Sequence, residues 1–191
     1  MNVLAIECSC HQGSVATIHD GILTRSWEFE SPRGRGTEYF THLESALSEN
    51  PETDLVIVGT GPGSYNGLRM AISSAWGVAR ARGARIAGVS SLLGYAAPEY
   101  YILGDARANQ WFFARVANGA FLTAPELLTP GEARGRLLPG IPVYTTSELQ
   151  GLPEAIVAPP RAELLACRDF VEGLPEPLYL KAPHITKPAA G

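Results

Sequence analysis

The sequence predicts an α/β protein of two lobes, each a mixed five-stranded sheet with helices, the second lobe being reduced. Three observations lead to this prediction. The order strand-strand-strand-helix-strand-helix-strand-helix is completed once and then begins again. Each copy places a two-residue hairpin signal, Asp20-Gly21 or Asn118-Gly119, between its second and third strands. A type I′ turn needs positive φ at both of those positions. Each copy also has an acidic residue, Glu7 or Asp105, where its first strand ends.

The strands of the first lobe are apolar or alternating runs. Trp27 and Phe29 share one face of an alternating run whose other face carries Glu28 and Glu30. A continuous apolar run instead indicates a strand that is buried on both faces. The predicted strands are Val3–Ile6, Val15–Ile18, Ile22–Glu30, Leu55–Val58 and Arg85–Val89.

The helices of the first lobe follow from apolar spacing and from end signals. Tyr39, Leu43, Ala46 and Leu47 are spaced i, i+4, i+7 and i+8, which gives a single apolar stripe. Gly83 follows the last periodic residues of a second helix, as expected of a helix end. The predicted helices are Thr37–Glu49, Leu68–Arg82 and a short one over Leu92–Ala97.

The second lobe repeats this order with fewer helices. Its predicted strands are Tyr100–Gly104, Gln110–Val116, Phe121–Leu128, Pro142–Thr146 and Ala155–Ala158. Its predicted helices are a weak one over Glu132–Leu138 and a second over Arg161–Glu172. We therefore expect lobes at residues 1–98 and 99–191, with a tail from about residue 175 to 191 that packs back on the first lobe.

Two copies of this element order describe the duplicated ribonuclease-H-like unit of the actin/sugar-kinase/Hsp70 superfamily. A Rossmann sheet is the competing fold. The hairpin near the start of each lobe disfavours it, because hairpins join antiparallel strands and a Rossmann sheet is mostly parallel.

Length and composition exclude several classes of protein. The chain has 191 residues, 46% of them hydrophobic, and a formal net charge of −4. An acidic balance argues against independent binding of a nucleic-acid backbone, which needs clustered basic residues. No apolar run reaches the roughly 18 residues of a membrane span, and no basic start marks a signal peptide. The three sparse cysteines, Cys8, Cys10 and Cys167, suit a reducing compartment, so we expect a cytoplasmic protein.

A glycine-rich loop is the strongest candidate site. It follows a buried strand and opens a helix, where free N–H groups and the helix dipole favour an anion. It lacks the lysine of a P-loop, and it also fails the dinucleotide and lipase-type patterns. The alternative is a tight turn that packs Gly67 against a neighbour. The candidate anion or nucleotide residues are Gly59, Gly61, Gly63, Ser64 and Gly67.

The same loop carries a family resemblance. The stretch from Val58 to Arg69, with Gly61-Pro62-Gly63-Ser64 at its centre and Gly67-Leu68-Arg69 at its end, resembles the signature of the TsaB (YeaZ) family. Asn66 replaces the family's common threonine. Three further stretches agree in order and spacing, namely Leu4-Ala5-Ile6-Glu7, Asp105-Ala106-Arg107 and Glu176-Pro177-Leu178-Tyr179-Leu180-Lys181.

The resemblance implies a role in bacterial tRNA modification. TsaB-like proteins are noncatalytic relatives of the catalytic subunit TsaD, which works with the ATPase TsaE to transfer threonylcarbamoyl onto a tRNA adenosine. It implies a TsaD-like partner, a TsaE-like partner, a homodimer when alone, and contact with tRNA only through the complex. It also implies no cofactor of the chain's own, with ATP or ADP and Mg²⁺ on the partner subunits.

The residues themselves also weigh against catalysis. The second-lobe counterpart of the glycine loop, Ser147–Gly151, is not glycine-rich, so half of a nucleotide clamp is missing. The four histidines are scattered, which argues against a metal centre, and Cys8 is best interpreted as a small buried thiol. Glu7 stands where the family has aspartate; we interpret Glu7 and Asp105 as solvated or turn-capping acids. The alternatives are an active nucleotide-dependent phosphotransferase or peptidase-like enzyme, and a diverged homologue with a changed interface.

The two main helices carry more apolar residues than one stripe requires. Phe40 and Trp76 lie outside a single ~100° stripe, which suggests a second buried face. The alternative is a purely structural role, in which these residues only cover the sheet. In the family that the chain resembles, these helices form the homodimer and the TsaD contact. The candidate interface residues are Tyr39, Phe40, Leu43, Leu47, Arg69, Ile72 and Trp76.

Overall fold

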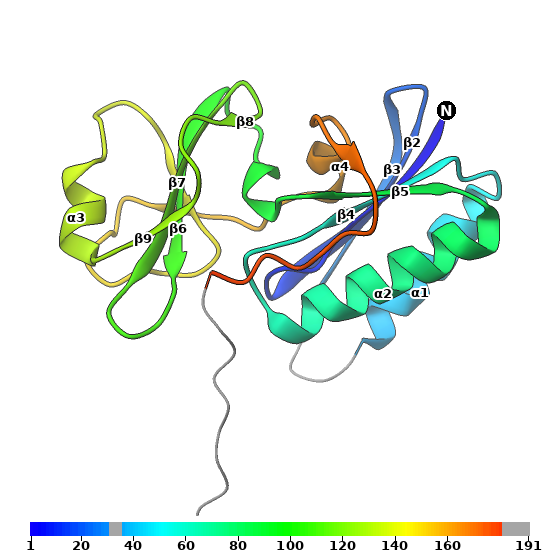
Figure 1. Ribbon diagram of the computed structural model, residues 1–191, viewed down its shortest axis with the longest axis horizontal. Helices are drawn as coiled ribbons and strands as arrows, with labels where there is room; N and C mark the ends of the chain where they lie inside the picture. Colours follow the sequence, from blue (N-terminus) through cyan, green and yellow to red (C-terminus); the bar gives the residue numbers. More distant parts are fainter. Residues whose placement is uncertain (31–35, 181–191) are drawn as a thin grey trace, which may run out of the picture.

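The computed structural model describes residues 1–30 and 36–180, which form two lobes (Figure 1). The first sheet contains β1 Asn2–Glu7, β2 Gln12–His19, β3 Ile22–Glu30, β4 Leu55–Gly59, β5 Arg85–Val89 and β12 Val171–Glu172. The second contains β6 Glu99–Asp105, β7 Trp111–Ala117, β8 Ala120–Phe121, β9 Glu126–Leu128, β10 Val143–Thr145 and β11 Ile156–Val157.

The two sheets share one strand order. The first runs β12-β5-β4-β1-β2-β3, and the second runs β11-β10-β6-β7-β8, with β9 also paired to β7. In each, the first three strands are antiparallel neighbours and the next strand lies parallel to the first. The second sheet therefore repeats the core order of the first, and the predicted pair of ribonuclease-H-like lobes is confirmed.

Each sheet has six strands instead of the predicted five. In the first sheet, the additional strand is β12, which pairs antiparallel with β5. In the second sheet, the predicted strand Phe121–Leu128 is divided into β8 and β9, both of which pair with β7. Pro125 lies in the gap, where its missing N–H removes a donor from the ladder.

Both predicted hairpin turns form. Asp20 and Gly21 have φ of 47° and 80°, and Asn118 and Gly119 have φ of 52° and 77°. These positive values are the ones that a type I′ turn requires, and the turns join the second and third strands of each lobe as predicted.

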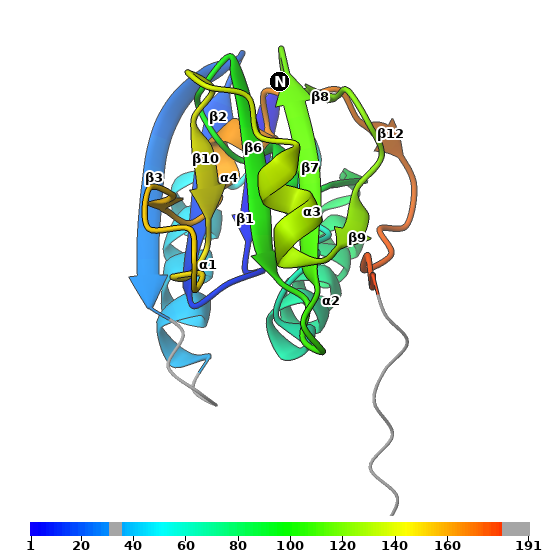
Figure 2. The ribbon, with the colours of Figure 1, turned by 90° about the vertical axis from the view of Figure 1, so that its left-hand side faces the viewer.

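The helices are α1 Thr37–Glu49, α2 Tyr65–Arg82, α3 Pro130–Gly135 and α4 Ala162–Leu165, with a 3₁₀ turn at Ser91–Leu93. Helix α1 has its predicted bounds, whereas α2 begins three residues earlier than predicted. Figures 1 and 2 show α1 and α2 together on one face of the first sheet. Alternate residues of β1 separate the two faces. Leu4 and Ile6 pack with α1 and α2, whereas Val3 and Ala5 pack on the other side with α4.

The predicted helix over Arg161–Glu172 is wrong in extent. Only Ala162–Leu165 is α-helical, and Val171–Glu172 joins the first sheet as β12. Between them the Arg168 guanidinium donates to the carbonyls of Leu93 and Tyr95, at 2.9 and 2.7 Å. These tertiary bonds and the strand pairing override the local helical pattern.

The predicted helix over Leu92–Ala97 is likewise reduced to the 3₁₀ turn. Gly94 lies against Pro160, and its carbonyl accepts from the N–H of Arg161. The carbonyl that would continue the helix is therefore used by a distant segment.

One hydrophobic cluster is shared between the lobes. It contains Ala5 and Ile57 of the first sheet together with Ile102 and Ala114 of the second. The rings of Tyr95, Tyr100 and Tyr144 pack against one another in the same region, with centroids 4.8 to 5.6 Å apart. The lobes are therefore joined by a continuous hydrophobic core. Among the described residues, no helix is both long and apolar enough to cross a membrane.

Candidate functional site: the glycine loop and the cleft

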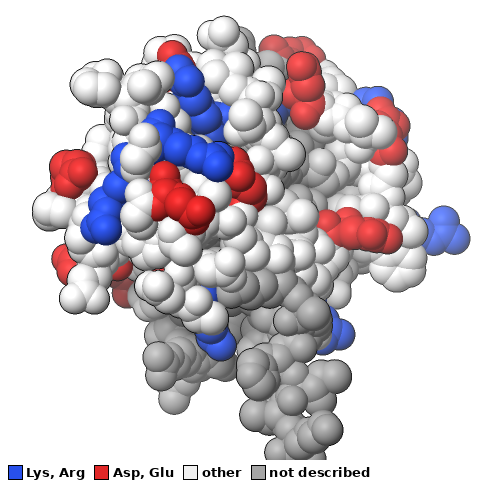
Figure 3. All heavy atoms as spheres, turned by 60° about the vertical axis from the view of Figure 1, so that its left-hand side comes forward, with Lys and Arg blue, Asp and Glu red and all other residues white. Residues whose placement is uncertain are grey.

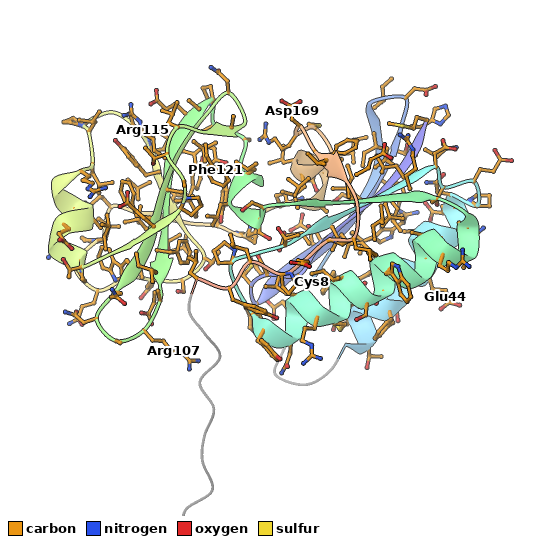
Figure 4. The ribbon with its side chains drawn as sticks, in the orientation of Figure 1. Cys8, Glu44, Arg107, Arg115, Phe121 and Asp169 are labelled. Carbon is orange, nitrogen blue, oxygen red and sulfur yellow. The ribbon has the colours of Figure 1, made fainter. Side chains whose placement is uncertain are left out.

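A cleft of about 1130 Å³ lies between the lobes. The first lobe contributes the turn after β1 and the glycine loop with the start of α2, including Ser9 and Ser64. The second lobe contributes the β6–β7 turn, with Asp105 and Arg107, and the loop after β10. Figure 4 shows Cys8 in the first lobe and Arg107 at the tip of the β6–β7 turn in the second.

The glycine loop is packed tightly on the turn after β1. A Cβ at Gly63 would overlap the carbonyl oxygen of Ser9, and one at Gly67 would overlap that of Cys8, in both cases inside the 3.0 Å that real Cβ atoms keep. The Ser64 N–H donates to the Ser9 carbonyl at 2.6 Å. The alternative that the sequence left open, close packing of Gly67 against a neighbour, is what the structure contains.

The same loop begins α2. Ser64 is its N-cap, and the Ser64 hydroxyl accepts from the N–H of Gly67 at 3.3 Å. At the first turn of a helix the remaining N–H groups have no intrahelical acceptor. Anion binding by these groups, with Gly59, Gly61 and Gly63 giving the backbone its close approach, stays a prediction.

The buried side chain of Glu7 connects the glycine loop, the turn after β1 and the 3₁₀ turn. Its side chain is fully buried, and its carboxylate accepts from the Ser9 N–H at 2.5 Å and from the Ser91 hydroxyl at 2.6 Å. The Ser91 oxygen in turn accepts from the N–H of Gly61 at 2.9 Å. A Cβ at Gly59 would overlap the Glu7 carboxylate. Glu7 therefore holds the glycine loop in place and has no surface in the cleft.

Asp105 repeats half of this arrangement in the second lobe. Its carboxylate accepts from the Arg107 N–H at 2.8 Å, two residues along the chain, as Glu7 accepts from Ser9. Asp105 is exposed to solvent. The interpretation of both acids as turn caps is thus confirmed. The interpretation of Glu7 as solvated is wrong, because the loop and the 3₁₀ turn enclose it.

Burial raises the pKa of Glu7 above its usual value of 4.5, and the hydrogen bonds from Ser9 and Ser91 oppose this only in part. The folded protein therefore holds a proton at pH values where the unfolded chain has released it. Glu7 contributes stability below its unfolded pKa, and this contribution is lost as pH rises through its folded pKa.

We expect Glu7→Gln, which does not titrate, to gain stability relative to the wild type as pH rises from about 4.5. Thermal unfolding of both proteins between about pH 4 and pH 8 measures the difference. Glu44→Gln, the same substitution on the exposed side of α1, is the control. A pH-independent difference for Glu7→Gln would contradict the assignment.

The two cysteines beside Glu7 are protonated thiols. Burial, followed by the charge of Glu7, raises the pKa of Cys8 well above its usual range and that of Cys10 to about 12. The Cys10 thiol donates to the Gln12 carbonyl. The interpretation of Cys8 as a small buried thiol is confirmed. Within residues 1–30 and 36–180, no group of three or more His, Cys, Asp or Glu residues could hold a metal ion.

The predicted interface residues differ in how far their side chains are exposed to solvent. Tyr39 and Leu43 are only 1% and 6% exposed and cover the sheet, so their assignment to a partner surface is corrected. Phe40 and Trp76 are 51% and 53% exposed. Leu47 and Ile72 are half-buried, and Arg69 is exposed, donating to the Tyr65 hydroxyl at 2.8 Å. The surface available to a partner is therefore carried by Phe40, Trp76 and Arg69.

Sequence reasoning missed the residues that fix the loop. Ser91 is distant in sequence from Glu7, and no local pattern could identify it. The role of Ser9 could have been predicted, because acids commonly accept a hydrogen bond from the N–H two residues further along the chain. Ser64 could also have been predicted as an N-cap, and that prediction would have placed the start of α2 correctly.

A family model and solved structures of other proteins are similar to this chain. The family model described as TsaD, tRNA N6-adenosine threonylcarbamoyltransferase, matches residues 41–124. The structure of YeaZ from Pseudomonas aeruginosa superimposes with a TM-score of 0.71 at 21% identity, covering 94% of this chain and 99% of that chain. Residues 41–124 match the TsaD family, and the chain has the fold of YeaZ.

Two further proteins are similar to this chain. A second structure, described as an uncharacterized protein with similarity to peptidase YeaZ from Pseudomonas aeruginosa, gives a TM-score of 0.72 at 22% identity, covering 94% of this chain and 99% of that one. An uncharacterized protein of Mycobacterium leprae is 31% identical over 142 residues, which are 69% of this chain and 39% of that protein. The chain therefore spans about two fifths of the length of that relative.

Proposed function

We propose that this chain is a noncatalytic scaffold subunit of a bacterial tRNA threonylcarbamoyladenosine complex, in which it binds and supports a TsaD-like catalytic subunit. The observation that carries the proposal is the enclosure of the Glu7 carboxylate by Ser9 and Ser91. An acid that positions a metal ion for phosphate chemistry must face the cleft. In this chain, the acid at the end of the first strand is used to hold the loop.

The second lobe supports the same proposal. Its loop after β10 is fastened by Thr145, whose hydroxyl donates to the Ser147 carbonyl at 2.6 Å, and it has no glycine-rich turn there. Nucleotide clamps of two-lobed kinases grip phosphates from both sides, and here only one side has a candidate loop. We accordingly place ATP or ADP and Mg²⁺ on the partner subunits, including a TsaE-like ATPase.

The exposed faces of α1 and α2 supply the partner surface in this proposal. Phe40 and Trp76 are large aromatic side chains that are about half exposed, and aromatic anchors dominate the energy of many interfaces. Alone, the chain would pair these faces in a homodimer. In the complex, the TsaD-like subunit would take the place of the second copy.

The distribution of charge favours contact with tRNA through the complex. On the face that Figure 3 brings forward, basic side chains lie beside acidic ones. The second lobe contains the partly exposed ion pairs Arg115–Glu99 and Arg136–Glu126. Paired charges of this kind give little net attraction for a phosphate backbone. We propose cytoplasmic action on tRNA through the partners.

The test is reconstitution of tRNA modification from purified subunits. The chain alone should neither hydrolyse ATP nor modify tRNA, whereas adding it to TsaD-like and TsaE-like subunits should raise their modification activity at least tenfold. The control is the same mixture without the chain. Turnover by the chain alone would instead support the alternative, a nucleotide-dependent phosphotransferase or a peptidase-like enzyme.

A further inference from the structure

The segment after β12, residues 174–180, crosses the glycine loop, and we call it the C-terminal strap. It leaves the edge of the first sheet where the Gly173 N–H donates to the Ile86 carbonyl at 3.0 Å. Pro175 then lies on Gly88, where a Cβ would come within 3.0 Å of it. The Leu178 N–H donates to the Thr60 carbonyl at 2.8 Å. The strap is thereby fastened to the first residues of the loop.

The far end of the strap reaches the other end of the same loop. The ring of Tyr179 packs against that of Tyr65, with centroids 5.5 Å apart and planes inclined by 31°. The Arg69 guanidinium lies over the Tyr65 ring, 5.1 Å from its centroid. Leu178, Tyr179 and Leu180 also line the cleft between the lobes. The strap therefore forms one wall of the cleft and contacts both ends of the loop.

The attachments of the strap are few and exposed. Strand β12 has two residues, and the ion pair that flanks it, Arg85–Glu172, is about half exposed at both side chains. Leu174 is 71% exposed, and Tyr179 is 40% exposed. Segments with few buried contacts open locally at a free-energy cost well below that of global unfolding. Strand β4, the neighbour of β5, is buried along its whole length, so the sheet beneath the strap remains folded when the strap opens.

We propose that the C-terminal strap is a releasable latch, which when seated closes one wall of the cleft and fixes Tyr65 at the start of α2. Release removes the Leu178–Thr60 hydrogen bond and the Tyr179–Tyr65 contact together. The cleft then loses this wall, and Tyr65 loses its contact with the strap. This inference does not depend on the proposed scaffold function.

Hydrogen exchange of the full chain tests the latch. Tyr179→Ala should speed exchange of the backbone N–H groups in residues 60–69 by about three- to tenfold, the range expected from loss of one aromatic pair. Tyr179→Phe keeps the ring and should exchange like the wild type. Leu178→Pro, which removes the donor to Thr60, should act like Tyr179→Ala, whereas Leu178→Ala keeps the N–H.

Peptides from β6 and β7 in the second lobe provide the internal reference. Under the proposal their exchange is unchanged in all four variants, because they contact the first lobe through the shared core. Unchanged exchange of residues 60–69 in Tyr179→Ala and Leu178→Pro would overturn the latch. Faster exchange throughout both lobes would also overturn it, because the strap would then be an ordinary part of the folded core.

Discussion

Gly67→Ala is expected to destabilise the protein by about 1–3 kcal/mol, the usual cost of forcing an extra methyl group into a packed site. The added Cβ would overlap the carbonyl oxygen of Cys8, which belongs to the backbone and cannot rotate away. Gly77→Ala is the matched control in the same helix. Its Cβ would meet open space, and alanine in a helix interior is favoured over glycine by about 1 kcal/mol.

The two variants should therefore move the stability in opposite directions. Urea unfolding measures both differences, and Gly67→Ala should lower the midpoint while Gly77→Ala raises it. Equal effects of the same sign would show that helix propensity, and not contact with the turn after β1, determines the need for glycine at position 67.

Trp76→Glu is expected to weaken binding of a TsaD-like partner at least thirtyfold while leaving the fold intact. An anchor tryptophan at the centre of an interface contributes about 2 kcal/mol or more when it is buried by a partner. The side chain is about half exposed in the free chain, so the charge is tolerated before binding. Pull-down and calorimetric titration with the TsaD-like subunit measure the loss.

Leu122→Glu is the matched control for this prediction, since Leu122 is equally exposed but lies in the second lobe. Binding that is unchanged by Trp76→Glu, or weakened equally by both variants, would remove α2 from the proposed interface. Leu43→Glu is unsuitable as a test, because Leu43 lies in the core and the charge would unfold the lobe.

The fold could be predicted from the sequence because its signals are local. Hairpin glycines, the alternation of Trp27 and Phe29 with charged residues, and the apolar stripe of α1 each act over a few residues. The errors share one cause, which is contact between distant segments. Arg168 and β12 end the predicted last helix by bonding to the first lobe, and Gly94 gives its carbonyl to Arg161.

The candidate site was predictable only in outline. The spacing of its glycines predicts the loop. Its geometry, however, depends on contacts with Ser91 and with the turn after β1, which are distant in the sequence. Burial could not be deduced for Glu7, because an acid at a strand end is usually exposed. For the same reason, the sequence did not distinguish Tyr39, which lies in the core, from its neighbour Phe40, which is exposed to solvent.

The positions of α4 and β12 have a consequence for the order in which the protein is made. Along the chain, the strands of the second lobe lie between two portions of the first, so the second lobe is an insertion with both of its ends tied to its host. During synthesis the edge of β5 stays unpaired until β12 has left the ribosome. A fragment of residues 1–98 would lack both α4 and β12. The first lobe therefore reaches its final form only after the inserted lobe has been completed.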